Sequence, residues 1–133
     1  MSSEIYWLTL TVIYSSLLFV PHTLYRMATT GPLKLLNNPV PGDEPFAVGW
    51  ARRSNRAHMN ALENLASFAP VILAIELTGA SNETTVMAAQ VYFWARVVHA
   101  PFCIVKTPAV RTIAYIVGMS ATLTIAAKLL KIF

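Results

Sequence analysis

The sequence is poor in cysteine and in charged residues, and both shortages narrow the class of protein. Its 133 residues include one cysteine, so no disulfide can form within the chain. Charged residues make up 12% and apolar residues 56%; a typical soluble domain carries about twice that charge. Intrinsic disorder is excluded, because it needs low hydrophobicity and high charge. The net charge of +4 does not indicate nucleic-acid binding, because the basic residues stand at the edges of apolar runs, as in membrane proteins.

Four apolar segments could cross a membrane as helices, which takes about 20 mostly apolar residues. The first, residues 5–25, has no charged residue in 21 positions, and the fourth, residues 112–127, is also uncharged. The second and third, near residues 57–77 and 86–105, are apolar with polar residues inside them. We therefore predict one all-α domain over residues 1–133, an integral membrane four-helix bundle with helices at about 4–27, 51–77, 84–106 and 109–131.

The connections of this predicted bundle differ in length and charge. The loop expected at residues 28–50 holds four of the eight prolines, and a loop of roughly 20 residues is more often used for binding than for connection alone. Basic residues favour the side of this loop and of the loop at 106–111: seven lie there (Arg26, Lys34, Arg52, Arg53, Arg56, Lys106 and Arg111), against Lys128 and Lys131 on the other side. By the positive-inside rule, we expect loops 28–50 and 106–111 in the cytoplasm.

Polar side chains recur at helical spacing inside the second and third segments. A charge at membrane depth costs about 2.5–3.5 kcal/mol, so such residues usually face protein or a water-filled cavity. Steps of three and four residues place each set on one helical face: Arg53, Arg56, Asn60, Glu63 and Ser67 in the second segment, and Arg96, His99 and Cys103 in the third. We expect both faces to point into the bundle or a subunit interface and to form a polar cavity that opens toward the cytoplasmic side.

Spacing alone leaves three interpretations of these faces open. Glu63 and Arg96 could form a structural ion pair between helices, with asparagines as interhelical hydrogen-bonding residues. The residues could instead bind an anionic, peptide-like ligand, because arginine binds carboxylates in bidentate fashion and one glutamate suits an ammonium group. A proton or cation pathway is the third. We expect no metal site, because no zinc-motif spacing is present among His22, His58, His99 and Cys103.

The run RRSNRAHMNALENLASF, residues 52–68, resembles the second-helix signature of the membrane-associated proteins in eicosanoid and glutathione metabolism, the MAPEG family. The specific part is R-A-H-x-N-x-x-E, residues 56–63. Arg96-x-x-His99 followed by Pro101, and then PAVRT at residues 108–112, are also similar to that family. Length, four-helix hydropathy and the long first loop agree, and the closest likeness is to small bacterial members.

This resemblance implies a homotrimer of four-helix subunits, here in a bacterial inner membrane, that binds glutathione between adjacent subunits near the cytoplasmic side. Motif positions imply that the glutathione backbone is held by Arg53, Arg56, Asn60 and Glu63. They imply that Arg96 and His99 line the same pocket from the neighbouring subunit, and that Arg26 matches a further binding arginine. Arg111 would be catalytic and face the glutathione sulfur, with the Thr112 hydroxyl beside it.

The implied activity is a glutathione transferase that conjugates the glutathione thiolate to small hydrophobic electrophiles, which could arrive through lipid. Glutathione-dependent peroxide reduction is a further activity of the family. One departure is Cys103, which stands where a tyrosine that contacts the ligand is common. The alternative is a non-catalytic, lipid-binding scaffold member of the same family. A small proton-coupled exporter is disfavoured, because such exporters need a glutamate in the first helix and this chain has none between Glu4 and the end of that segment.

Overall fold

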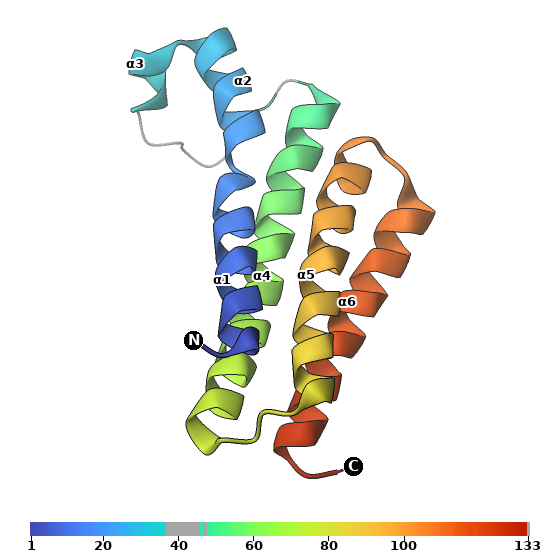
Figure 1. The fold of residues 1–133 in the computed structure, drawn as a ribbon. Helices are drawn as coiled ribbons and strands as arrows, with labels where there is room; N and C mark the ends of the chain where they lie inside the picture. The colour runs from blue at the N-terminus through green and yellow to red at the C-terminus, as the bar shows by residue number, and fades with distance from the viewer. Residues whose placement is uncertain (37–45, 47, 133) are drawn as a thin grey trace.

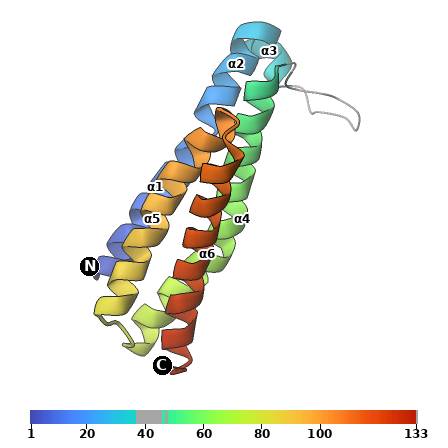
Figure 2. The same cartoon turned by 90° about the vertical axis from the view of Figure 1, so that its right-hand side faces the viewer.

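The computed structural model describes residues 1–36, 46 and 48–132, and in that part of the chain all regular structure is helical. The helices are α1 (Ser3–Leu17), α2 (Val20–Thr30), α3 (Pro32–Leu35), α4 (Gly49–Thr78), α5 (Glu83–Ile104) and α6 (Pro108–Leu129). Both views show α1, α4, α5 and α6 side by side, with α2 and α3 extending beyond α1 at one end (Figure 1, Figure 2). The predicted all-α four-helix architecture is confirmed.

The first predicted helix is interrupted. Instead of one helix over residues 4–27, α1 ends at Leu17 and α2 begins at Val20. Pro21 lies in the first turn of α2, where its missing N–H costs no hydrogen bond and its fixed φ suits a helix start. At the break, the Leu18 N–H donates to the Ser15 carbonyl at 3.3 Å, a shorter-range bond than the helical one. Proline therefore separates two helices here, whereas Pro70 and Pro101 lie inside α4 and α5.

The two predicted cytoplasmic loops are shorter than expected where the structure describes them. α2 continues to Thr30, and α3 lies within the segment predicted as loop 28–50. Residues 37–45 and 47, ten of the 23 positions of that loop, lie outside the described residues, so its binding role stays a prediction. The connection expected at 106–111 ends where α6 begins at Pro108. Arg111 is therefore in the first turn of α6 and has a fixed helical position.

Three of the four predicted membrane spans are long and apolar enough to cross a membrane by their own composition: Ser3–Thr30, Gly49–Thr78 and Pro108–Leu129. α5 has the same 22-residue length as α6, but it carries polar side chains along its buried face, including Arg96 and His99. It packs against α1, α4 and most extensively α6. Its polar residues therefore face protein, which is where charges at membrane depth are tolerated.

The apolar core occupies the half of the bundle that lies toward the two termini (Figure 1). It is built by all four long helices, from Leu8, Phe68, Ile72, Ile75, Ala88, Ala89, Tyr92, Ala121 and Ile125. Phe68 and Tyr92 stack with ring centroids 3.7 Å apart and nearly parallel planes. The small alanine side chains let α5 approach α4 and α6 closely, so this half of the bundle has a packed apolar core. The opposite half contains the polar residues of α4 and α5.

A buried carboxylate ties the start of α1 to the start of α5. Glu4 is 1% exposed, and its Oε1 accepts hydrogen bonds from the hydroxyls of Ser81 at 2.6 Å and Thr85 at 2.7 Å. Thr85 also belongs to the capping box of α5, in which its backbone N–H donates to Asn82 Oδ1 at 3.1 Å. A negative charge at this position is favoured by the exposed N–H groups of a helix N-terminus.

We expect Glu4→Gln to lower the thermal stability of the purified protein. Hydrogen bonds to charged groups contribute about 1.5–3 kcal/mol, and the amide replaces an ionised acceptor with a neutral one in a buried site. The measurement is the thermal unfolding midpoint in detergent. Glu83→Gln is the matched control, because Glu83 is an exposed acid in the first turn of α5, the helix whose start Glu4 contacts. Equal midpoints for the two variants would contradict a stabilising role for Glu4.

Candidate functional site

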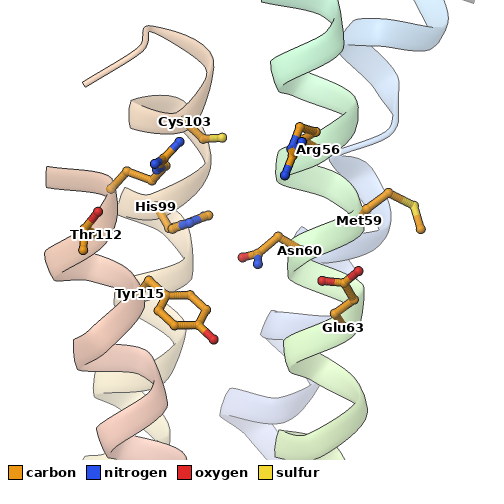
Figure 3. Close-up of a pocket in the computed structure, with 9 residues that line it drawn as sticks. Arg56, Met59, Asn60, Glu63, His99, Cys103, Thr112 and Tyr115 are labelled. Carbon is orange, nitrogen blue, oxygen red and sulfur yellow. The ribbon is translucent and has the colours of Figure 1, made fainter. Parts of the chain in front are cut away.

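A polar cavity of about 420 Å³ lies between α4 on one side and α5 and α6 on the other (Figure 3). Its lining residues are Arg56, Met59, Asn60, Glu63, His99, Cys103, Arg111, Thr112 and Tyr115. Six of the nine predicted site residues are therefore brought together: Arg56, Asn60, Glu63, His99, Arg111 and Thr112. They come from three motif segments, on α4, α5 and α6, which the bundle makes neighbours. His99, which the resemblance placed in the pocket of a neighbouring subunit, lines the cavity of its own chain.

The α4 wall presents charges of both signs. Arg56, Asn60 and Glu63 follow one another by four and three residues, so they share one helical face. Arg56 and Glu63 are exposed, and in the described part of the chain Glu63 forms no ion pair. The Oδ1 atom of Asn60 is buried and has no hydrogen-bond partner there. This wall can therefore offer a cation, an amide and an anion to a ligand.

The opposite wall is cationic and carries the thiol. α5 contributes His99 and Cys103, and α6 contributes Arg111, Thr112 and Tyr115 (Figure 3). Arg111 and Thr112 are exposed and stand in the first turns of α6, whose N-terminal dipole also favours an anion. With Arg56 on the facing wall, two guanidinium groups border one small volume that can hold an anionic ligand or stabilise a developing anion.

Arg96 lies one helical turn from His99 toward the start of α5 and is not among the residues that line the cavity. Its side chain is 2% exposed, and its guanidinium carbon lies 5.2 Å from the ring centroid of Tyr92 and 5.6 Å from that of Tyr115. Nη2 donates to the Tyr115 carbonyl oxygen at 3.3 Å, whereas Nε and Nη1 are buried without partners among the described residues. Arg96 thus supports Tyr115, a lining residue, from behind.

Two further predicted site residues lie outside the cavity of this single chain. Arg53 turns toward the end of α5, where its Nε donates to the Ile104 carbonyl oxygen at 2.7 Å, a common way to satisfy the last carbonyls of a helix. Arg26 is on α2, which packs on α4, and it is not among the lining residues. Their predicted contacts with glutathione stay predictions.

The structural interpretation, a Glu63–Arg96 ion pair with asparagines bonded between helices, has no such contact within the described part of this single chain. Arg96 donates to a backbone carbonyl rather than to Glu63. The Asn64 amide donates to the Asn60 carbonyl oxygen at 2.7 Å, within α4, so it does not connect helices. A metal centre is not assembled either: the described residues contain no group of three or more His, Cys, Asp or Glu side chains that could hold one. The cavity is compatible with the ligand-binding interpretation, which stays a prediction at this point.

Tyr115 is a lining residue that the sequence reasoning missed. It follows Arg111 by four residues and Thr112 by three, so it belongs to the same face of α6. The spacing is therefore a signal in the sequence: one further helical turn after Arg111 and Thr112 leads to Tyr115. Its ring also lies 6.4 Å from that of His99, which makes it the part of the lining that joins the α5 and α6 contributions.

Fold and cavity together define a helical membrane protein with a polar cavity near one end of the bundle. Comparison with protein families then gives a specific assignment: the chain belongs to the MAPEG family, whose model matches residues 5–131.

Among curated proteins, it is similar to microsomal glutathione S-transferase 1 of Mus musculus, with 34% identity over 80 residues. It is likewise similar to the proteins of that name from Bos taurus and Homo sapiens, each with 32% identity over 80 residues. These alignments cover 59% of this chain and 52% of each relative, so the chain spans about half the length of the curated relatives it matches. No solved structure matches it at comparable significance.

Proposed function

We propose that this protein is a membrane-bound glutathione transferase that binds glutathione in the α4–α5–α6 cavity and conjugates its thiolate to hydrophobic electrophiles, with reduction of hydroperoxides as a second reaction. The observation that carries the proposal is the convergence of Arg56, Glu63 and Arg111 on one cavity. Family membership and the names of the similar proteins point to the same co-substrate. The non-catalytic scaffold would not require these charged groups to meet.

The cavity suits the charges of glutathione, which has two carboxylates, one ammonium group and one thiol. Arg56 can bind a carboxylate with two parallel hydrogen bonds, and Glu63 on the same wall can accept from the ammonium group. The unpartnered Asn60 Oδ1 can accept from a peptide N–H of the ligand. Ligand binding would thus satisfy groups that lack partners in the described chain.

Arg111 and Thr112 can lower the pKa of the glutathione thiol, which a transferase must do to form the thiolate. An ordinary thiol has a pKa of about 8.5, so only about 3% is thiolate at pH 7. Lowering the thiol pKa by about two units requires about 2.7 kcal/mol of preferential stabilisation of the thiolate. A guanidinium aimed at sulfur, helped by a hydroxyl donor and the N-terminal dipole of α6, can provide this.

A homotrimer in the membrane would complete the site. Arg56, Glu63, Arg111 and Thr112 are all exposed in the single chain, so the cavity is open on one side. A neighbouring subunit could close that side and bring in Arg26 or Arg53 of its own, whereas Arg96 is enclosed within its own subunit. The electrophile would enter from lipid. We propose a bacterial inner-membrane location with the Arg-rich end, which holds the cavity, in the cytoplasm.

The test is to titrate the purified protein in detergent with glutathione and to follow the ultraviolet absorbance of the thiolate. A saturable signal at neutral pH, followed by product formation with a model electrophile, is the expected result. Absence of both the signal and calorimetric binding would overturn the transferase proposal and favour the scaffold alternative.

We expect Glu63→Gln to weaken glutathione binding by about 10- to 100-fold, the equivalent of the 1.5–3 kcal/mol of a charged hydrogen bond. The neutral amide keeps the shape of the side chain but no longer attracts the ligand's ammonium group. Binding is measured by calorimetry, and oligomeric state by size-exclusion chromatography. Glu76→Gln is the control, because Glu76 is exposed on the same helix and does not line the cavity. Unchanged affinity in the Glu63 variant would make Glu63 a structural residue.

A further inference from the structure

The cavity that we assign to glutathione also contains the chain's only thiol. Cys103 is the single cysteine of the sequence, and it lines the cavity from α5, one helical turn beyond His99 (Figure 3). The side chain is 7% exposed, and its one polar contact in the described chain is a weak one, from Sγ to the Arg53 carbonyl oxygen at 3.8 Å. The thiol is therefore shielded on its helix side and faces the cavity.

His99 is a second, independent feature of this wall. Its side chain is 6% exposed and lines the cavity, yet it has no hydrogen-bond partner among the described residues. Residues four apart on a helix are neighbours on its surface, with Cβ atoms about 5–6 Å apart. A buried imidazole with free ring nitrogens beside a thiol is the pair used for nucleophilic cysteine chemistry, because the imidazole accepts the thiol proton.

Two guanidinium groups border the same cavity. Arg56 lies on the α4 wall and Arg111 on the α6 wall, so cationic groups stand on both walls of the cavity that the Cys103 thiol faces. Cys103 thus combines the three requirements of a reactive cysteine: a base one turn away, cationic surroundings and a space that a small reactant can enter.

We propose that Cys103 is a catalytic nucleophile that reduces hydroperoxides and that glutathione, bound in the same cavity, regenerates it. This inference rests on the proposed function, because the regenerating thiol is the glutathione assigned to this cavity. It assigns the peroxide reaction to a protein thiol, whereas conjugation uses the thiol of glutathione.

The first step oxidises the protein thiol. His99 takes the Cys103 proton, and the thiolate sulfur attacks the terminal oxygen of the hydroperoxide. The O–O bond breaks, an S–O bond forms, and the alkoxide leaves with the electron pair and takes the proton back from His99. The products are an alcohol and a sulfenic acid at Cys103, so sulfur is oxidised by two electrons and the peroxide is reduced by two.

Two glutathione molecules then restore the thiol. The first glutathione thiolate attacks Sγ of the sulfenic acid, the S–O bond breaks, and hydroxide takes a proton and leaves as water. This forms a mixed disulfide between Cys103 and glutathione. A second glutathione thiolate attacks the glutathione sulfur of that disulfide, which releases the Cys103 thiolate and glutathione disulfide. The sum is one hydroperoxide and two glutathione molecules converted to alcohol, water and glutathione disulfide.

The test uses intact-protein mass spectrometry of the full-length wild-type chain in detergent. One sample of the protein is treated with cumene hydroperoxide and dimedone, which traps sulfenic acid. A second sample is treated with cumene hydroperoxide and then with a single equivalent of glutathione, so that no second glutathione molecule releases the mixed disulfide. Because Cys103 is the only cysteine, a dimedone or glutathione adduct reports on this residue, and dimedone does not report oxidation of Met59 in the same cavity. We expect one dimedone adduct in the first sample and one glutathione adduct in the second.

Turnover gives the second measurement. We expect Cys103→Ser to lose both adducts and to lose glutathione-dependent reduction of cumene hydroperoxide. His99→Gln should slow formation of the dimedone adduct. Wild-type protein that binds glutathione in calorimetry but forms no adduct, or a Cys103→Ser variant with undiminished peroxide reduction, would overturn the inference and leave the transferase proposal standing. Wild-type protein that binds no glutathione would overturn the transferase proposal and with it the regeneration step.

Discussion

Arg111→Ala is expected to abolish formation of the glutathione thiolate at neutral pH while leaving glutathione binding largely intact. Arg111 borders the cavity from the first turn of α6, and one carboxylate and the ammonium group of the proposed ligand are assigned to Arg56 and Glu63. Losing about 2.7 kcal/mol of thiolate stabilisation returns the thiol pKa by about two units toward its free value, a roughly 100-fold loss in the thiolate-to-thiol ratio at neutral pH. The readouts are thiolate absorbance and calorimetric affinity, measured on the same preparation.

Two matched variants separate the role of Arg111 from a general effect of charge. Arg111→Lys keeps the charge but replaces a planar fork with a compact ammonium group, so it should retain part of the thiolate signal. Lys106→Ala removes a nearby exposed charge that does not line the cavity, and it should behave like the wild type. Loss of glutathione affinity in Arg111→Ala, with normal thiolate formation at saturating glutathione, would contradict the assigned role and make Arg111 a binding residue.

The α4 side of the site was predictable because helical periodicity alone determines it. Arg56, Asn60 and Glu63 must share a face whenever the segment is helical, and they line the cavity together. Periodicity does not say where a cavity begins and ends along that face. Arg53 is on the same stripe, but it lies close to the end of α5, and the Ile104 carbonyl oxygen is its partner. This contact depends on where a second helix terminates, which the α4 sequence does not contain.

Arg96 shows the same limit at the other end of the cavity. It shares a stripe with His99 and Cys103, yet it lies one turn deeper, where α6 approaches α5 closely and the space is filled by rings and backbone. The interruption between α1 and α2 is a comparable case. Pro21 marks a disturbance in the sequence, but a kink and a separation of two helices have the same sequence signal, and packing of α2 on α4 decides between them.

Gly118 is the feature of α6 that admits the buried guanidinium of Arg96. A Cβ atom at this position would lie 2.9 Å from Cζ and 3.0 Å from Nε of Arg96, and closer still to Nη2. The guanidinium has little freedom to retreat, because the Tyr92 and Tyr115 rings lie within 6 Å of it and its side chain is buried. The absence of a side chain at Gly118 is thus a steric requirement, although glycine is otherwise unfavourable inside a helix by about 1 kcal/mol.

We therefore expect Gly118→Ala to destabilise the protein by about 1–3 kcal/mol, the usual cost of overpacking a filled interior, despite the higher helix propensity of alanine. Displacing Arg96 also breaks its hydrogen bond to the Tyr115 carbonyl, so the Tyr115 ring should shift and glutathione affinity should fall. Thermal midpoints and calorimetry measure the two effects, with Ser120→Ala as an exposed control on the same helix. If the steric explanation is correct, Gly118→Ala should lower the stability far less in an Arg96→Ala background. The stability effects of substitutions at two residues in contact do not simply add. Equal costs in the two backgrounds would show that Gly118 is needed for something other than the space that Arg96 occupies.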